Sequence, residues 1–167
     1  MRVLVAVASR HDATAEIGEA IGRHLTDAGL EVEVLAAESV GAMGAYDAVV
    51  LGSSVYMGSW LPAATKLVDR FQIDLRERPV WLFSSGPIGS PAKPEGDPAA
   101  AVQIARSVNA IEHRTFAGRL ERDRLGLGEK LVSAAVRAPD GDFRDWEAVA
   151  SWSREIVAEL VRVAVEA

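Results

Sequence analysis

Short apolar runs alternate along the chain with stretches in which apolar residues recur every three or four positions. The short runs predict strands, and the longer stretches predict helices. The predicted strands span 3–8, 32–35, 48–51, 80–83 and 115–117. The predicted helices span 14–28, 61–72, 98–108 and 146–165. The first strand is apolar throughout, as is typical of a strand covered on both faces.

The alternation of strand and helix predicts an α/β protein with a parallel sheet and helices on both of its faces. The length of 167 residues fits a single domain over 1–167 that is long enough to bury a large core. Ligands of such sheets bind at the carboxyl ends of the strands, at a switch in strand order. The loops that follow the strands are therefore the first place to look for a functional site.

The composition argues against several classes of function. A formal net charge of −6 disfavours a nucleic-acid partner, and a chain without cysteine has no disulfide or thiolate chemistry. The three histidines are far apart and lack helical pairing, so no metal site is expected. No apolar run approaches the roughly 20 residues that cross a bilayer, and the N-terminus lacks the pattern of a secretion signal. We therefore expect a cytoplasmic protein.

Three predicted strands end in loops of small, hydroxylated or glycine residues, and these loops would meet at one edge of the sheet. Small residues let a ligand approach the backbone, whose N–H groups can bind it. The candidate binding residues are Ser9, Arg10, His11, Asp12, Ala13 and Thr14 in the first loop, Ser53, Ser54, Val55, Tyr56, Met57 and Gly58 in the second, and Ser84, Ser85, Gly86, Pro87, Ile88 and Gly89 in the third.

The first loop runs directly into a predicted helix that starts at Thr14 or Ala15. The unpaired N–H groups and the dipole of a helix N-terminus attract anions, and the hydroxyl groups of Ser9 and Thr14 add donors. This arrangement predicts a phosphate-bearing ligand. The alternative is that Thr14 only caps the helix and that the loop binds nothing.

The second and third loops narrow the class of ligand further. Tyr56 and Trp60 follow the third strand beside glycine and serine, and two aromatic rings could flank a flat ligand ring. The alternative is that Trp60 packs at the start of the next helix and Tyr56 is a surface residue. The third loop, 86–91, is rigid and poor in side chains, which suits backbone contact with a ring edge. A phosphate and a flat ring together describe a mononucleotide.

The first loop resembles the phosphate loop of the flavodoxin-like family of FMN-binding domains, whose pattern is close to T/S-x-T-G-x-T. Ser9 matches the first hydroxyl of that pattern and Thr14 the last. His11 stands in place of the middle threonine, and Asp12 in place of the glycine. The resemblance implies a three-layer α/β/α sandwich with a five-stranded parallel sheet of order 2-1-3-4-5. It also implies FMN as the cofactor.

Within that family the chain is most similar to the menaquinone-dependent protoporphyrinogen dehydrogenases. Arg10 follows the leading hydroxyl as it does in that branch, and residues 52–54 with Gly58 match the branch's second loop. Met57 stands where the branch often carries an aromatic, so the residue that stacks on the flavin stays open. The segment 145–156 resembles the start of the branch's last helix.

The resemblance implies an FMN-dependent oxidoreductase that oxidises protoporphyrinogen IX with a quinone as acceptor. No residue stands out as an acid or base, which is expected when the flavin carries hydride and electron transfer. Two alternatives stay open. The chain is an electron-transfer flavodoxin without a substrate of its own, or a flavodoxin-like domain that no longer binds flavin.

Positive charge gathers between the fifth strand and the last helix. Residues 114–137 hold six cationic and three acidic side chains. Within this segment, 129–137 has the pattern of a short amphipathic helix. We expect weak contact of 119–137 with an anionic membrane surface, at the inner face of the membrane, or with the propionates of a porphyrin. The alternative is a solvated, salt-bridged insertion.

Overall fold

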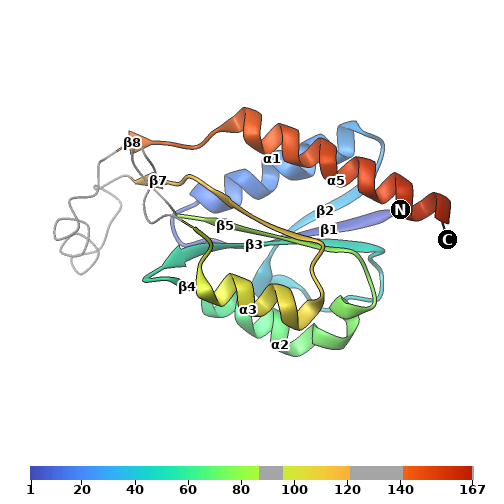
Figure 1. Ribbon diagram of the computed structural model, residues 1–167, viewed down its shortest axis with the longest axis horizontal. Coiled ribbons are helices and arrows are strands. Elements are labelled where there is room, and N and C mark those ends of the chain that lie inside the picture. The colour runs from blue at the N-terminus through green and yellow to red at the C-terminus, as the bar shows by residue number, and fades with distance from the viewer. Residues whose placement is uncertain (87–95, 121–140, 167) are drawn as a thin grey trace.

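The computed structural model describes residues 1–86, 96–120 and 141–166. A central sheet lies between two layers of helices (Figure 1). The helices α1 (Ala13–Asp27) and α5 (Trp146–Glu166) cover one face. The helices α2 (Pro62–Arg76) and α3 (Ala99–Val108) cover the other. The predicted three-layer sandwich is confirmed.

Parallel strands form the body of the sheet, with one short antiparallel strand added. In spatial order the parallel strands of the described ranges are β2 (Glu31–Ala36), β1 (Arg2–Ala8), β3 (Ala48–Tyr56), β5 (Val80–Ser85) and β6 (Glu112–Phe116). Counting only these strands, the order is 2-1-3-4-5, as predicted. The added strand, β4 (Ser59–Trp60), pairs antiparallel with the end of β3. A one-turn 3-10 helix, η1 (Ala37–Ser39), follows β2.

The third strand is longer than predicted because its end folds into a hairpin. Tyr56 of β3 pairs with Ser59 of β4. Met57 and Gly58 between them both have positive φ, at 49° and 76°. Two positive φ values in a two-residue turn match the twist of paired strands. The apolar pattern predicted a loop after 51, and the hairpin corrects that prediction.

The strand β6 starts earlier than predicted, at Glu112 instead of residue 115. Its first residues are Glu112, His113 and Arg114, which show no apolar pattern. These polar side chains are accommodated at the sheet edge by partners on other elements, among them Glu155 for Arg114 and Ser84 for His113. An apolar pattern alone therefore could not locate the start of this strand.

Two apolar cores fill the spaces between the sheet and its helices. Successive residues of β1 alternate between them, with Leu4 in the core beneath α2 and α3 and Val5 in the core beneath α1 and α5. The ring of Phe83 lies across Gly52 on the neighbouring strand, where a Cβ would come within 2.0 Å of the ring. Only glycine leaves room for this packing of β5 against β3.

A two-stranded ribbon lies outside the main sheet. It pairs β7 (Arg119–Leu120) with β8 (Gly141–Asp142) and sits at the same end of the molecule as β4 (Figure 1). The carboxyl ends of the parallel strands also lie there. The predicted short helix over 129–137 and the candidate residues Pro87, Ile88 and Gly89 lie outside the described residues.

The contact between Phe83 and Gly52 predicts that Gly52→Ala destabilises the fold by about 1–3 kcal/mol, the usual range for overpacking a core. Urea unfolding of the two proteins measures the difference. Gly44→Ala is the matched control, because no heavy atom lies within 4 Å of a Cβ at that position. Equal stability of wild type and Gly52→Ala would contradict this view of the packing.

Candidate functional site

The first loop leaves donors open at the start of α1. The hydroxyl oxygen of Ser9 is buried and has no hydrogen-bond partner in the described part of the chain. The N–H of Ala13 donates to His11 O (2.7 Å) and that of Glu16 to Asp12 O (2.9 Å). Within the described residues, the N–H groups of Thr14 and Ala15 between them have no acceptor. A buried hydroxyl beside open helical N–H groups is the arrangement that an anion completes.

Asp12 is the N-cap residue of α1 and adopts a left-handed conformation, with φ 62° and ψ −25°. It makes no side-chain cap hydrogen bond. This is the conformation that glycine adopts most easily, and the loop pattern places glycine at this position. A backbone conformation that favours glycine is thus adopted here by an aspartate.

Thr14 lies inside the first turn of α1 and is buried. Its hydroxyl shares a 2.7 Å hydrogen bond with the hydroxyl of Ser54, which lies near the end of the strand β3. Thr14 is therefore not the capping residue of α1, which is Asp12. The bond instead joins the first loop to the second.

The second and third strand ends are joined by Trp60. Its indole N–H donates to Ser84 Oγ over 2.7 Å, and its ring is buried in the core. Trp60 thus packs inside the protein and does not flank a ligand ring. The hydroxyl of Ser53 also has internal partners, since it accepts from the N–H of Leu61 and donates to the carbonyl of Ser54.

The hairpin tip carries the exposed candidates of the second loop. The side chain of Met57 is 80% exposed and that of Tyr56 is 37% exposed. The guanidinium of Arg10 lies 5.1 Å from the centre of the Tyr56 ring. This cation–π contact is a second link between the first and second loops. Tyr56 is the aromatic ring that the described site offers to a flat ligand.

The third strand end is close-packed backbone. Ser85 is buried, and the N–H of Gly86 reaches the carbonyl of Phe116 at 3.4 Å. A Cβ on Gly118 would lie 3.3 Å from the Cα of Gly86. Two glycines in contact leave this edge lined by backbone.

A buried polar chain continues from Ser84 to the edge of the sheet. The Nε2 atom of His113 lies 2.9 Å from Ser84 Oγ, and its Nδ1 atom lies 3.1 Å from Asp97 Oδ1 at ion-pair distance without a well-formed hydrogen bond. Thr115 donates to the same carboxylate oxygen. Since Ser84 is fully buried and accepts from Trp60, this set braces the sheet and presents no nucleophile. No local sequence pattern predicts this set, because Asp97, Ser84 and His113 come from separate segments of the chain.

Burial lowers the pKa of His113 below its ordinary value, although Asp97 and Glu112 act in the opposite direction. The imidazole is therefore held neutral inside the fold. Neutral His113 with its proton on Nδ1 can accept from Ser84, which in turn accepts from Trp60. Protonation would turn Nε2 into a donor, and the Ser84 hydroxyl would then lose Nε2 as its acceptor.

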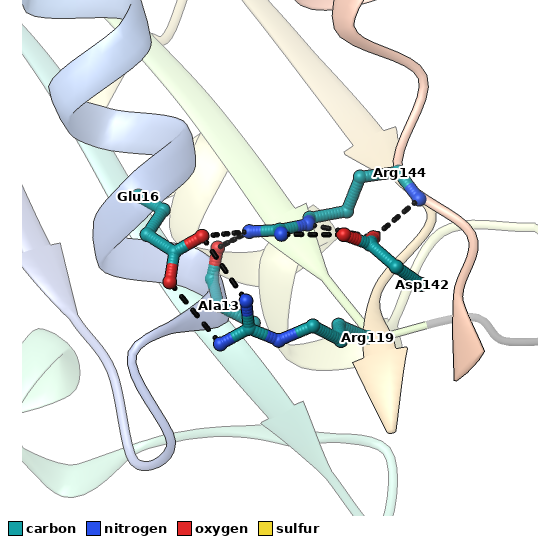
Figure 2. Close-up of polar contacts among 5 residues, drawn as sticks. All are labelled: Ala13, Glu16, Arg119, Asp142 and Arg144. Atoms are coloured by element: carbon teal, nitrogen blue, oxygen red, sulfur yellow. Dashed lines mark hydrogen bonds and ion pairs between the residues drawn. The ribbon is translucent and has the colours of Figure 1, made fainter. Parts of the chain in front are cut away.

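A cluster of ion pairs fixes the ribbon to the first turn of α1 (Figure 2). The Arg144 guanidinium lies between Asp142, which it contacts at 2.6 and 2.8 Å, and Glu16, which it contacts at 2.6 Å. It also donates to the carbonyl of Ala13 at 3.3 Å. Arg119 reaches both carboxylate oxygens of Glu16, at 3.1 and 3.2 Å. Hydrogen bonds from Arg144 lower the pKa of Glu16 and of Asp142.

These contacts bear on the excess of positive charge in residues 114–137. Arg119 is paired with Glu16, and Arg114 is paired with Glu112 and Glu155. Part of the positive charge between β6 and α5 is thus compensated inside the fold. The other cations of the segment, Arg122, Arg124, Lys130 and Arg137, lie outside the described residues.

Over residues 1–86, 96–120 and 141–166, no helix is long and apolar enough to cross a membrane. Over the same part of the chain, no group of histidine and acidic side chains is arranged to hold a metal ion.

The chain belongs to the flavodoxin domain family, whose model matches residues 4–146. Members of this family bind FMN. The cofactor predicted from the loops is therefore the cofactor of the family. No curated protein matches the chain.

Solved structures with the same fold are distant in sequence. A flavodoxin from the domain Archaea is 18% identical, with a TM-score of 0.59, over 82% of this chain and 99% of the other. A flavodoxin of Streptococcus pneumoniae TIGR4 is 17% identical, with a TM-score of 0.61, over 95% and 99%. The rubredoxin oxygen:oxidoreductase of Desulfovibrio gigas is 11% identical, with a TM-score of 0.62, over 99% of this chain and 37% of the other. These likenesses show the fold.

The buried histidine predicts a stability change at mildly acidic pH. The unfolded chain protonates His113 more readily than the folded protein, since burial lowers its folded pKa. The free energy of unfolding is therefore fully retained above about pH 6.5 and falls as the pH drops below it. Urea unfolding at about pH 7.5 and about pH 5.5 measures the change. We expect His113→Gln to flatten this dependence.

His24→Gln is the matched control, because His24 lies in the last turn of α1 and is only half-buried. It should leave the pH dependence of wild type in place. The carboxylates of Glu16 and Asp142 have lowered pKa values and titrate below this pH window. A His113→Gln protein with the same pH dependence as wild type would show that another group is responsible.

Proposed function

We propose that this chain binds FMN and transfers electrons through it. The observation that carries the proposal is the buried Ser9 hydroxyl without a partner in the described chain, beside the open N–H groups of Thr14 and Ala15. A phosphate group supplies acceptor oxygens for all three donors. The residues present thus fit the phosphate of a flavin mononucleotide.

The first loop favours a ligand with one phosphate group. A dinucleotide-binding chain carries G-x-G-x-x-G after its first strand, and this chain has Ser9–Thr14 there instead. Asp12 adds a negative charge to the loop, which weakens the attraction for phosphate relative to glycine. The N-terminus of α1 and the hydroxyl donors act in the favourable direction.

The remaining loops suit the flavin ring. Tyr56 offers a half-exposed aromatic face at the end of β3, and the contact between Gly86 and Gly118 offers backbone at the end of β5. FMN supplies hydride and electron transfer when bound. The chain's own residues bind the phosphate, orient the ring and shield one side of it from water.

We further propose that the electron donor is protoporphyrinogen IX and the acceptor a quinone. Support comes from the resemblance of the loops to that branch, including Arg10 after Ser9. Each pair of electrons and protons removed from the porphyrinogen reduces one quinone to its quinol. The cations at 122–137 are the groups proposed to meet porphyrin propionates or an anionic membrane surface.

Electron transfer without a small-molecule substrate is the second candidate. It is favoured by the pairing of Arg114 and Arg119 with carboxylates, which reduces the positive charge available to an anionic substrate.

Titration with FMN is the first test of the proposal. We expect saturable quenching of flavin fluorescence, and weaker binding by Thr14→Val. The variant removes a hydroxyl donor and leaves Ser54 without its partner, which costs roughly 1–3 kcal/mol, or about ten- to a hundredfold in affinity. Thr65→Val on α2 is the control, because its exposed hydroxyl bonds only within its own helix turn. If the wild-type protein shows no quenching at high micromolar FMN, the chain is a domain that no longer binds flavin.

The FMN-loaded protein should oxidise protoporphyrinogen IX with a soluble quinone. Because cations attract the propionates and anionic lipid headgroups, Arg122→Ser with Arg124→Ser should lower turnover and salt-sensitive binding to anionic vesicles, and leave FMN affinity unchanged. Arg154→Ser is the control, since Arg154 is an exposed cation on α5. A protein that binds FMN, shows no turnover and passes electrons to a protein acceptor would instead be an electron carrier.

A further inference from the structure

Glu16 lies in the first turn of α1, the same turn that offers the N–H groups of Thr14 and Ala15. A carboxylate at a helix N-terminus stabilises the helix. It also repels a second anion bound at that terminus. A phosphate site built on this turn therefore needs the charge of Glu16 to be compensated.

Two arginines compensate that charge from outside the helix. Arg144 and Arg119 both contact the Glu16 carboxylate, and their side chains are only 3% and 15% exposed (Figure 2). Asp142 balances Arg144 in turn, so the four charges sum to zero. The carboxylates are more open, with the side chains of Glu16 and Asp142 38% and 43% exposed, so the cluster lies at the protein surface with its guanidinium groups covered.

The ion-pair cluster also holds the shape of the turn. Arg144 donates to the carbonyl of Ala13, and the N-cap of α1 makes no side-chain cap hydrogen bond. The guanidinium is also stacked 4.5 Å from the centre of the Trp146 ring, which fixes its position from the α5 side. Ion pairs at the surface and in the interior both often add little to stability. The role of these ion pairs is better explained by their effect on the charge and the geometry of the first turn of α1.

We infer that Arg144 and Arg119 are positioning residues for the cofactor phosphate. They neutralise Glu16 and hold the first turn of α1, and so make this helix terminus able to accept an anion. The inference rests on the proposed binding of FMN. It assigns the ribbon β7–β8 a function in cofactor affinity, because Arg119 and Asp142 are ribbon residues and Arg144 follows it directly.

The test compares FMN with riboflavin, which has the same ring and no phosphate. Both are titrated by fluorescence quenching into the full-length protein. Arg144→Met should weaken FMN binding by roughly three- to tenfold, because it removes one of the two cations that compensate Glu16 in the turn proposed to bind phosphate, while Arg119 stays paired with Glu16. It should leave riboflavin affinity within about twofold. Adding Glu16→Gln to Arg144→Met should restore most of the FMN affinity.

Glu16→Gln alone covers the case in which Arg144→Met does not fold. Its amide oxygen still accepts from Arg144, and it leaves an excess positive charge at the turn. We expect severalfold tighter FMN binding with no change for riboflavin. Arg114→Met is the matched control, because Arg114 also pairs with two carboxylates and lies 5.7 Å from the centre of the Trp152 ring. It should not alter the ratio of the two affinities.

The outcomes separate the two proposals. If Arg144→Met lowers both flavin affinities equally, or Glu16→Gln leaves the FMN-to-riboflavin ratio unchanged, the cluster is only structural and the inference is overturned. If wild type binds riboflavin as tightly as FMN, phosphate does not bind at this turn and the inference fails while flavin binding stands. If wild type binds neither, the proposed function fails with it.

Discussion

The parallel register of three central strands is the constraint on which the site depends. Ala8 of β1 pairs with Ser53 of β3, and Ser53 pairs with Ser84 of β5. The parallel pairing of the three strands therefore stops within one residue of the same level, and β3 continues past it into the hairpin with β4. The segments that follow this level emerge side by side. Buried apolar side chains on both faces keep this register, since a slip by one residue would turn each strand's core residues toward the wrong face. The loops then need only short contacts, such as Thr14 to Ser54 and Trp60 to Ser84, to become one site.

The sequence was most informative where local chemistry decides the structure. The strand order, the helices and the loop from Ser9 to Thr14 follow from apolar periodicity, a polar loop and a helix start. It was least informative where a residue's partner is distant in the chain. Arg144 and Glu16 are 128 positions apart, and no local pattern joins them. The polar start of β6 was missed for the same reason, because its side chains are paired with other elements rather than buried in apolar surroundings.

Charge counting illustrates the same difficulty. A count over 114–137 finds an excess of cations and suggests a surface that attracts anions. In the fold, Arg114 and Arg119 face carboxylates from α5, β6 and α1, all outside or at the margin of that segment. A local sum of charges omits partners that folding brings in from elsewhere. The same holds for hydroxyl groups, because the sequence does not show which of them have partners in the fold. Ser53 and Ser84 have internal partners, while Ser9 has none in the described chain.

The hydrogen bond from Trp60 to Ser84 has a consequence for how the protein fluctuates. It ties the hairpin after β3 to the end of β5, and His113 extends the tie to β6. Loops with separate supports open independently, whereas loops that share a buried bond open together. The indole N–H of Trp60 and the backbone N–H of Gly86 should therefore exchange with solvent in one cooperative event. The two sides of the site proposed for the flavin ring would then form and be lost as a single unit.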